Sequence, residues 1–135
     1  MRCQAALRLF SDTRPAAEVT VRLGIEPTTS HERGDRLGAR TRAVARQSGW
    51  VLSTDVREPS DLHEHLIELL DRVEPVRDRL LELTHAGWEM DWFCFVEAVA
   101  LEHAVELDHD LLRRLAALPG ALLIDTYGKD EQDAP

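Results

Sequence analysis

The 135-residue sequence has only two cysteines, Cys3 and Cys94, and they form no CxxC pair. They lie far apart in the sequence, so no paired-thiol site is indicated. Cysteines of a cytoplasmic protein stay reduced, and we expect both to be small apolar strand residues. A Cys3–Cys94 bridge is the alternative if their two strands are neighbours.

Motifs of catalysis and cofactor binding are also lacking. The seven glycines are scattered singly, so there is no glycine-rich phosphate loop, and no GxSxG nucleophile motif occurs. His63-Glu64-His65 is the tightest histidine group, but on a helix positions i and i+2 point about 200° apart. Ile67 occupies the place where HExxH would need its second histidine. We therefore predict no catalytic residue, no metal and no cofactor.

One looser group keeps a metal-dependent hydrolase as a third hypothesis. His103 and His109 flank a turn that is rich in carboxylates, namely those of Glu102, Asp108 and Asp110. Histidine together with carboxylates is a common ligand set for Zn²⁺ and related metals. The spacing matches no metal-binding motif, so surface histidines are the simpler interpretation.

Long hydrophobic runs are scarce, and so is positive charge. The apolar stretch after Arg2 ends at Phe10 and is interrupted by Arg8, which is too short for a signal peptide or membrane span, so we expect a cytoplasmic protein. The net charge is −9 at pH 7, from 25 acidic and 16 basic residues. Such a surface repels phosphate backbones and anionic lipids, which disfavours nucleic acid and membranes as partners and favours a basic protein.

The most regular pattern is an amphipathic stretch from Ser60 to Ala86. At about 100° per residue its apolar side chains fall on one side: Leu62, Leu66, Leu69, Leu70, Val73, Val76, Leu80 and Leu83. Ser60 is the predicted N-cap and Gly87 the predicted stop. Pro75 interrupts the hydrogen bonding but leaves the stripe in phase, so we predict one kinked helix or two nearly coaxial ones.

Shorter patterns fill the rest of the chain. Alternating apolar residues predict strands, and capping residues beside apolar stripes predict two shorter helices. The strands are expected over residues 4–10, 49–55, 88–97 and 121–127, and the helices over residues 15–23 and 109–118. Asp108 is the N-cap of the latter helix, and its predicted buried stripe is Leu111, Leu112, Leu115 and Leu118. Ala98 to Leu107 is ambiguous between helix and strand, and we assign it to a short strand.

This order of elements predicts an α+β fold: a mostly antiparallel sheet on which one long kinked amphipathic helix and two shorter helices pack. The length is that of one domain. We expect a single domain over residues 1–128, followed by an acidic C-terminal tail over residues 129–135.

Two features carry the candidate binding chemistry. The loop over residues 28–48 is the one locally basic region, with Arg33, Arg36, Arg40, Arg42 and Arg46. A solvated loop is its simpler interpretation, and an anion clamp is the sharper one. Asp125 lies in an apolar strand on the same face as Leu123 and Tyr127, where a half-buried carboxylate needs a partner. Asp125 either forms an internal ion pair with an arginine of the loop or lines a pocket beside Tyr127 and Trp50.

Several segments, taken together, resemble one family of small bacterial proteins. They are Glu18-Val19-Thr20 through Leu23-Gly24-Ile25-Glu26-Pro27, His31 with Arg33-Gly34-Asp35, Gly49-Trp50 with Leu52-Ser53-Thr54, Asp61-Leu62, Leu111-Leu112-Arg113-Arg114-Leu115 and Ile124-Asp125-Thr126-Tyr127. In order and spacing the chain is similar, over nearly its whole length, to the family catalogued as domain of unknown function 4279. The resemblance implies a compact α+β domain and brings no catalytic residues. It also suggests one structural neighbourhood made of Gly34, Asp35, Trp50, Asp125 and Tyr127.

These observations favour a non-catalytic, cytoplasmic protein-interaction module, with a homodimer as a further expectation. An acidic domain of this size would mask a basic toxin or enzyme by charge complementarity, in the manner of an immunity protein. The alternative is a small-molecule or anion-binding domain that joins the arginine-rich loop to the sheet. The ligand-binding residues of that alternative are Arg33, Asp35, Trp50, Asp125 and Tyr127.

Overall fold

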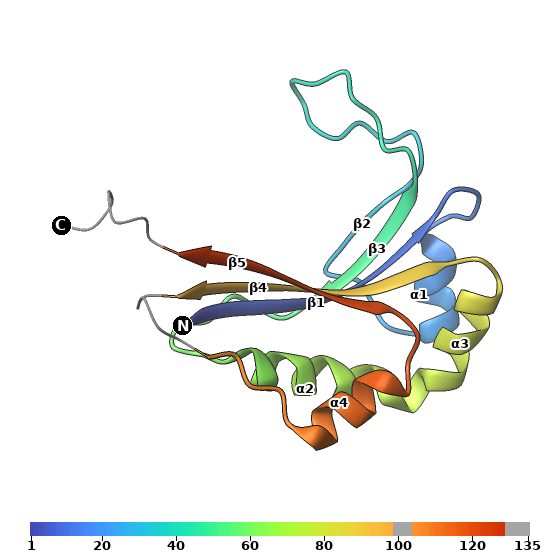
Figure 1. The fold of residues 1–135 in the computed structure, drawn as a ribbon. Helices are drawn as coiled ribbons and strands as arrows, with labels where there is room; N and C mark the ends of the chain where they lie inside the picture. The colour runs from blue at the N-terminus through green and yellow to red at the C-terminus, as the bar shows by residue number, and fades with distance from the viewer. Residues whose placement is uncertain (99–103, 129–135) are drawn as a thin grey trace.

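The chain forms one five-stranded sheet with helices packed on one of its faces (Figure 1). The computed structural model describes residues 1–98 and 104–128, and the fold class is α+β, as predicted. In chain order the elements are β1 (Arg2–Ser11), α1 (Ala17–Leu23), β2 (Thr29–His31), β3 (Ser48–Ser53), α2 (Leu62–Val73), the 3-10 helix η1 (Glu74–Val76), α3 (Arg77–His85), β4 (Glu89–Ala98), α4 (His109–Ala116) and β5 (Ala121–Gly128).

The sheet is mixed. Its strand order is β2-β3-β1-β4-β5, with β1 in the centre. β1 pairs antiparallel with β3 and β4, and β2 pairs antiparallel with β3, but β5 runs parallel to β4. Three of the four pairings are thus antiparallel, as a mostly antiparallel sheet requires, and the parallel pairing of β5 with β4 is the exception that was not foreseen. A parallel pair needs a long crossover, and the segment that carries α4 supplies it.

The core lies between the sheet and the helices, and the alternation of β1 decides which face is buried. Leu7 and Leu9 are fully buried, whereas Arg8 between them is partly exposed on the opposite face. Leu7 lies opposite Leu52 of β3 and Trp92 of β4, both of which are buried. Burying one such leucine contributes about 1.5–3 kcal/mol, so a shift of one residue in register would be costly.

The long amphipathic stretch forms two helices, which is one of the two predicted forms, but the helices are not coaxial. Its apolar stripe is confirmed, but at Pro75 the chain passes through η1, because proline lacks the N–H that would continue the α-helix. Figure 1 shows α3 turning away from the line of α2, and α3 packs beside α1. The N-cap is Asp61, whose carboxylate accepts the Glu64 N–H, and not Ser60, whose hydroxyl donates to the Arg57 carbonyl.

Two further predictions are corrected near α4. β4 ends at Ala98, and residues 104–108 have no regular structure, so the predicted strand over Ala98 to Leu107 is not formed there; residues 99–103 lie outside the described residues. In α4 the structure buries Leu111 and confirms Asp108 as N-cap. Leu112, assigned to the buried stripe, is instead 47% exposed.

Both cysteines are buried, as expected of apolar strand residues. Cys3 and Cys94 are unpaired thiols on the helix-facing side of the neighbouring strands β1 and β4. Burial raises the pKa of both thiols, that of Cys94 to about 12, which keeps them protonated near neutral pH. In the described part of the chain no helix combines the length and apolarity that crossing a membrane requires.

Candidate functional site

The structure does not bring the predicted ligand-binding residues together. Trp50 is fully buried on the helix-facing side of β3, where its indole N–H donates to Thr20 Oγ1 at 3.1 Å. Asp125 and Tyr127 lie on β5, and the strands β1 and β4 separate β5 from β3. The neighbourhood suggested by the resemblance is therefore not formed, because Trp50 lies on β3 while Asp125 and Tyr127 lie on the edge strand β5, two strands away.

Asp125 needs no buried partner because it is not buried. It lies on an edge strand whose eight residues are all exposed, so water solvates its carboxylate. The Tyr127 hydroxyl donates to Asp125 Oδ2 at 2.9 Å, and this bond raises the pKa of the tyrosine. The predicted ion pair between Asp125 and an arginine of the loop is not formed among the described residues.

The arginine-rich loop is folded on itself and extends beyond the sheet (Figure 1). Backbone hydrogen bonds join its two sides, including Gly34 N–H to Ala45 O at 2.8 Å, and Asp35 accepts the Glu32 N–H. Arg33 donates to the Asp12 carbonyl at the base of the loop, and Glu32 accepts the N–H groups at the start of α1. These contacts anchor the loop and leave no convergent arginine cluster with Trp50.

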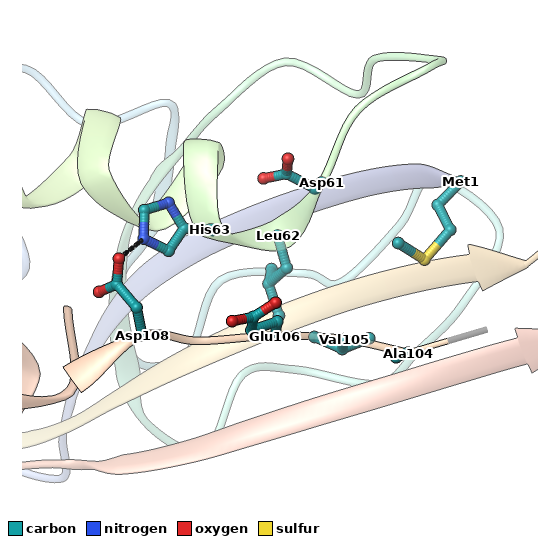
Figure 2. Close-up of a pocket in the computed structure, with 8 residues that line it drawn as sticks. All are labelled: Met1, Asp61, Leu62, His63, Ala104, Val105, Glu106 and Asp108. Carbon is teal, nitrogen blue, oxygen red and sulfur yellow. Dashed lines mark hydrogen bonds and ion pairs between the residues drawn. The ribbon is translucent and has the colours of Figure 1, made fainter.

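A pocket of about 250 Å³ lies where the N-termini of α2 and α4 meet (Figure 2). Its lining combines carboxylates with apolar side chains: Met1, Asp61, Leu62, His63, Ala104, Val105, Glu106 and Asp108. His63 Nε2 lies 3.0 Å from Asp108 Oδ2, and Asp108 Oδ1 accepts the Leu111 N–H at 2.8 Å. The Leu111 N–H, with the hydrogen bond from His63, holds the pKa of Asp108 below its usual value.

The chemistry of this pocket is limited. A histidine oriented by a carboxylate is the usual pair for general-base catalysis, but the lining residues include no serine, threonine, cysteine or lysine for it to activate. Asp61 and Asp108 are both occupied as helix caps. Among the described residues no cluster of three His, Cys, Asp or Glu side chains is placed to hold a metal. His103, on which the hydrolase hypothesis depends, lies outside the described residues.

A second surface has a more distinctive composition. We call it the open face: the side of the sheet opposite the helices, with Arg2, Arg8, Phe10, Phe93, Phe95 and Tyr127. These include all the phenylalanines and the one tyrosine of the chain. The three tryptophans, by contrast, are buried in the core. In the described part of the chain no helix covers this face (Figure 1).

The arginines and aromatic rings of the open face are stacked on one another. The Arg8 guanidinium lies 4.3 Å from the centre of the Phe93 ring and 5.2 Å from that of Phe10. Two hydrogen bonds of 2.7 and 2.8 Å fix it to the Asp91 carboxylate. Arg2 lies over Phe95 at 5.6 Å, and the Phe95 and Tyr127 rings lie 5.1 Å apart between centres, tilted by 43° to each other.

Comparison with models of protein families gives a match that covers the whole described fold. A family model described as "Domain of unknown function (DUF4279)" matches residues 1–129. The chain belongs to the DUF4279 family. None of the curated proteins and none of the solved structures gives a significant match. The resemblance inferred from the sequence is confirmed, and the DUF4279 match runs from β1 through β5.

The open face of this DUF4279 domain is the feature that sequence reasoning missed. The signal was present: Arg8 and Phe10 alternate with Leu7 and Leu9, and aromatic residues occupy both faces of β4. Alternation alone assigns residues to two faces without saying which face the helices leave bare. The strand order and the parallel pairing of β5 decide that, and neither is visible in a local pattern.

The link between α2 and α4 can be tested through the cap of α4. Asp108→Ala removes the acceptor for the Leu111 N–H and for His63, whereas Asp108→Asn keeps a capping oxygen. We expect Asp108→Ala to lower the melting temperature by several degrees at neutral pH, and Asp108→Asn to lower it clearly less. Equal losses in a thermal unfolding experiment would contradict a capping role.

Proposed function

We propose that this DUF4279 domain is a non-catalytic protein-interaction module that binds its partner through the open face. The observation that supports this is the gathering of every phenylalanine and the tyrosine, with two arginines, on an uncovered face of the sheet. Aromatic residues and arginine supply most of the binding energy in protein interfaces. The tryptophans, which would serve equally well, are committed to the core.

The open face is also organised before any partner arrives. Arg8 is held by Asp91 and by two rings, so its long side chain has little rotamer freedom left to lose on binding. Ordering a flexible side chain at an interface costs about 0.5–1.5 kcal/mol, and a preformed stack avoids most of that cost. The rigidity of these side chains therefore supports a role in binding, because little side-chain entropy is lost when a partner arrives.

The charge of the domain favours a basic partner. The net charge is −9, and on the open face the Asp125 carboxylate makes its hydrogen bond to a neutral tyrosine and no ion pair among the described residues. A cationic group of a partner would complete this site and would be steered toward it by the overall charge. Masking of a basic toxin or enzyme, as an immunity protein does, is the specific form of this proposal.

Small-molecule or anion binding has less support. Trp50 is buried and Asp125 lies beyond two intervening strands, so such a site would depend on the arginine-rich loop alone. Arg33 and Arg36 already donate to the backbone carbonyls of Asp12 and Thr41. The interaction module is the function that the geometry favours.

Affinity capture from an extract of the source organism tests the proposal. We expect the wild-type chain to retain a basic protein, and a Phe93→Ala/Phe95→Ala variant to lose about 2 kcal/mol of binding energy, as expected of interface hot spots. Val21→Ser, on the exposed surface of α1, is the matched control and should bind like the wild type. Capture of the chain alone, or capture that the double substitution leaves unchanged, would overturn it.

A further inference from the structure

The two edges of the sheet are built differently. β2, at one edge, is only three residues long and leads directly into the charged loop. β5, at the other edge, is eight residues long, and Leu122, Leu123 and Ile124 are 37%, 42% and 39% exposed. In the described part of the chain its outer side pairs with no strand. A long apolar edge invites pairing with another strand.

Natural proteins protect such edges, and β2 is protected where β5 is not. The usual devices are short length, lysine, proline, a bulge or inward-pointing charge. β2 uses short length, whereas β5 contains neither lysine nor proline. Its one charged residue is Asp125, whose carboxylate is hydrogen-bonded to Tyr127 of the same strand. This asymmetry between the two edges favours pairing of β5 with a further strand.

We infer that two copies of this chain pair through β5, antiparallel, so that two five-stranded sheets become one continuous sheet. A second copy of the chain is the best partner for the β5 edge because pairing two identical edges about a two-fold axis gives a closed dimer. Joining the two β5 edges leaves a β2 strand at each end of the combined sheet, and β2 is short and followed by charge. Two-fold pairing thus removes the exposed β5 edges of both copies at once. Any other added strand would bring a new exposed edge of its own.

The sequence of β5 also favours one register of this pairing over the neighbouring one. With the two-fold axis at Ile124, each Ile124 lies opposite Ile124 of the partner subunit, and each Leu123 lies opposite Asp125 of the partner subunit. Ala121, the smallest side chain before Gly128, then faces the large Tyr127 of the partner subunit. An axis at Asp125 would place two carboxylates directly opposite each other, which is destabilising. The axis at Ile124 is therefore favoured by charge and by side-chain size.

The dimer does not depend on the protein partner proposed above. It uses the edge of β5, and it leaves the open faces of both copies uncovered, side by side on one side of the joined sheet. Dimerisation is measured on the isolated chain, so its failure and the failure of partner capture are separate results.

Sedimentation equilibrium of the full chain gives the first test. We expect twice the chain mass of 15.3 kDa for the wild type. Ile124→Lys places two cations together at the axis and should give a monomer, whereas Leu123→Lys faces the partner's Asp125 and should remain dimeric. Val21→Lys, on α1, is the control and should remain dimeric. A monomeric wild type, or a dimer that survives Ile124→Lys, overturns the inference.

A cross-linking experiment keeps the test sharp if Ile124→Lys fails to fold. Residues directly opposite on antiparallel strands have Cα atoms about 4.5–5.5 Å apart, within the range of a disulfide. Ile124→Cys should therefore form a disulfide-linked dimer on mild oxidation, while Val21→Cys should not. Cys3 and Cys94 are buried and give no background. Absence of the cross-link in folded Ile124→Cys also overturns the proposed axis.

Discussion

Replacing His65 with alanine is expected to lower the free energy of unfolding by about 3 kcal/mol. His65 is fully buried in α2, and both of its ring nitrogens are hydrogen-bonded. Nδ1 lies 2.6 Å from Thr54 Oγ1, and Nε2 lies 3.1 Å from Ser60 Oγ. Alanine would leave a cavity and two hydroxyl groups without their partner.

The hydrogen-bond network assigns the neutral form of this histidine. The Ser60 hydroxyl donates to the Arg57 carbonyl, so its oxygen accepts the hydrogen on Nε2 of His65. Burial favours the uncharged ring, so Nδ1 is the acceptor for the Thr54 hydroxyl at 2.6 Å. The Ala5 carbonyl, at 3.4 Å, is the more distant acceptor for the same hydroxyl, and the Thr54 oxygen in turn accepts the Ala5 N–H. The histidine thus ties the start of α2 to β1 and to the segment after β3.

Urea unfolding of wild type and variant gives the measurement. His63→Ala is the matched control, because His63 lies two residues earlier on α2 and is partly exposed. We expect it to cost less than about 1 kcal/mol, as is usual for a side chain near the surface. Equal losses for the two variants would show that the buried network adds nothing.

The same histidine predicts how stability depends on pH. Burial, helped by the nearby positive charge of Arg57, lowers the pKa of His65 below 6.5 in the folded state. Below pH 6.5 the unfolded chain therefore binds a proton that the folded chain does not, and unfolding is favoured. We expect full stability above pH 6.5 and a progressive loss below it. A His65→Gln variant should lack this part of the pH dependence.

The elements of the fold follow from local patterns, and their arrangement does not. The apolar stripe of α2 and α3 and the cap at Asp108 were predictable because each depends on residues a few positions apart. The place of Asp61 as N-cap differs by one residue from the prediction, and helix ends are the least certain feature of any pattern. Pro75 marks the break correctly, but the direction that α3 takes depends on its packing against α1.

The predicted ligand site failed for a topological reason. Trp50 and Asp125 each lie on a predicted strand, and only the strand order places β1 and β4 between them. One signal for the parallel pairing was available, since a helix lies between β4 and β5, and parallel strands need a crossover of that kind. The edge position of β5 follows from that pairing, and it explains why Asp125 is solvated.

Gly120→Ala is expected to be more damaging still, with a loss of about 4 kcal/mol in the free energy of unfolding, from backbone strain and overpacking together. Gly120 immediately precedes β5 and has φ of +129°, a conformation that side chains disfavour. A Cβ atom there would lie 2.8 Å from the Met90 carbonyl oxygen on β4. That oxygen belongs to a paired strand, so it is not free to move away.

Gly87→Ala separates strain from collision. Gly87 also has a positive φ, of +103°, but no atom lies within 4 Å of its added Cβ. Its substitution should cost only the backbone strain, about 1–2 kcal/mol. The difference between the two variants in urea unfolding therefore measures how tightly the chain must approach β4 to place β5 beside it. A similar loss for both would mean that β5 keeps its position without this contact. A larger loss for Gly120→Ala, with a weaker dimer in the fraction that still folds, would tie the placement of β5 to the edge at which two copies meet.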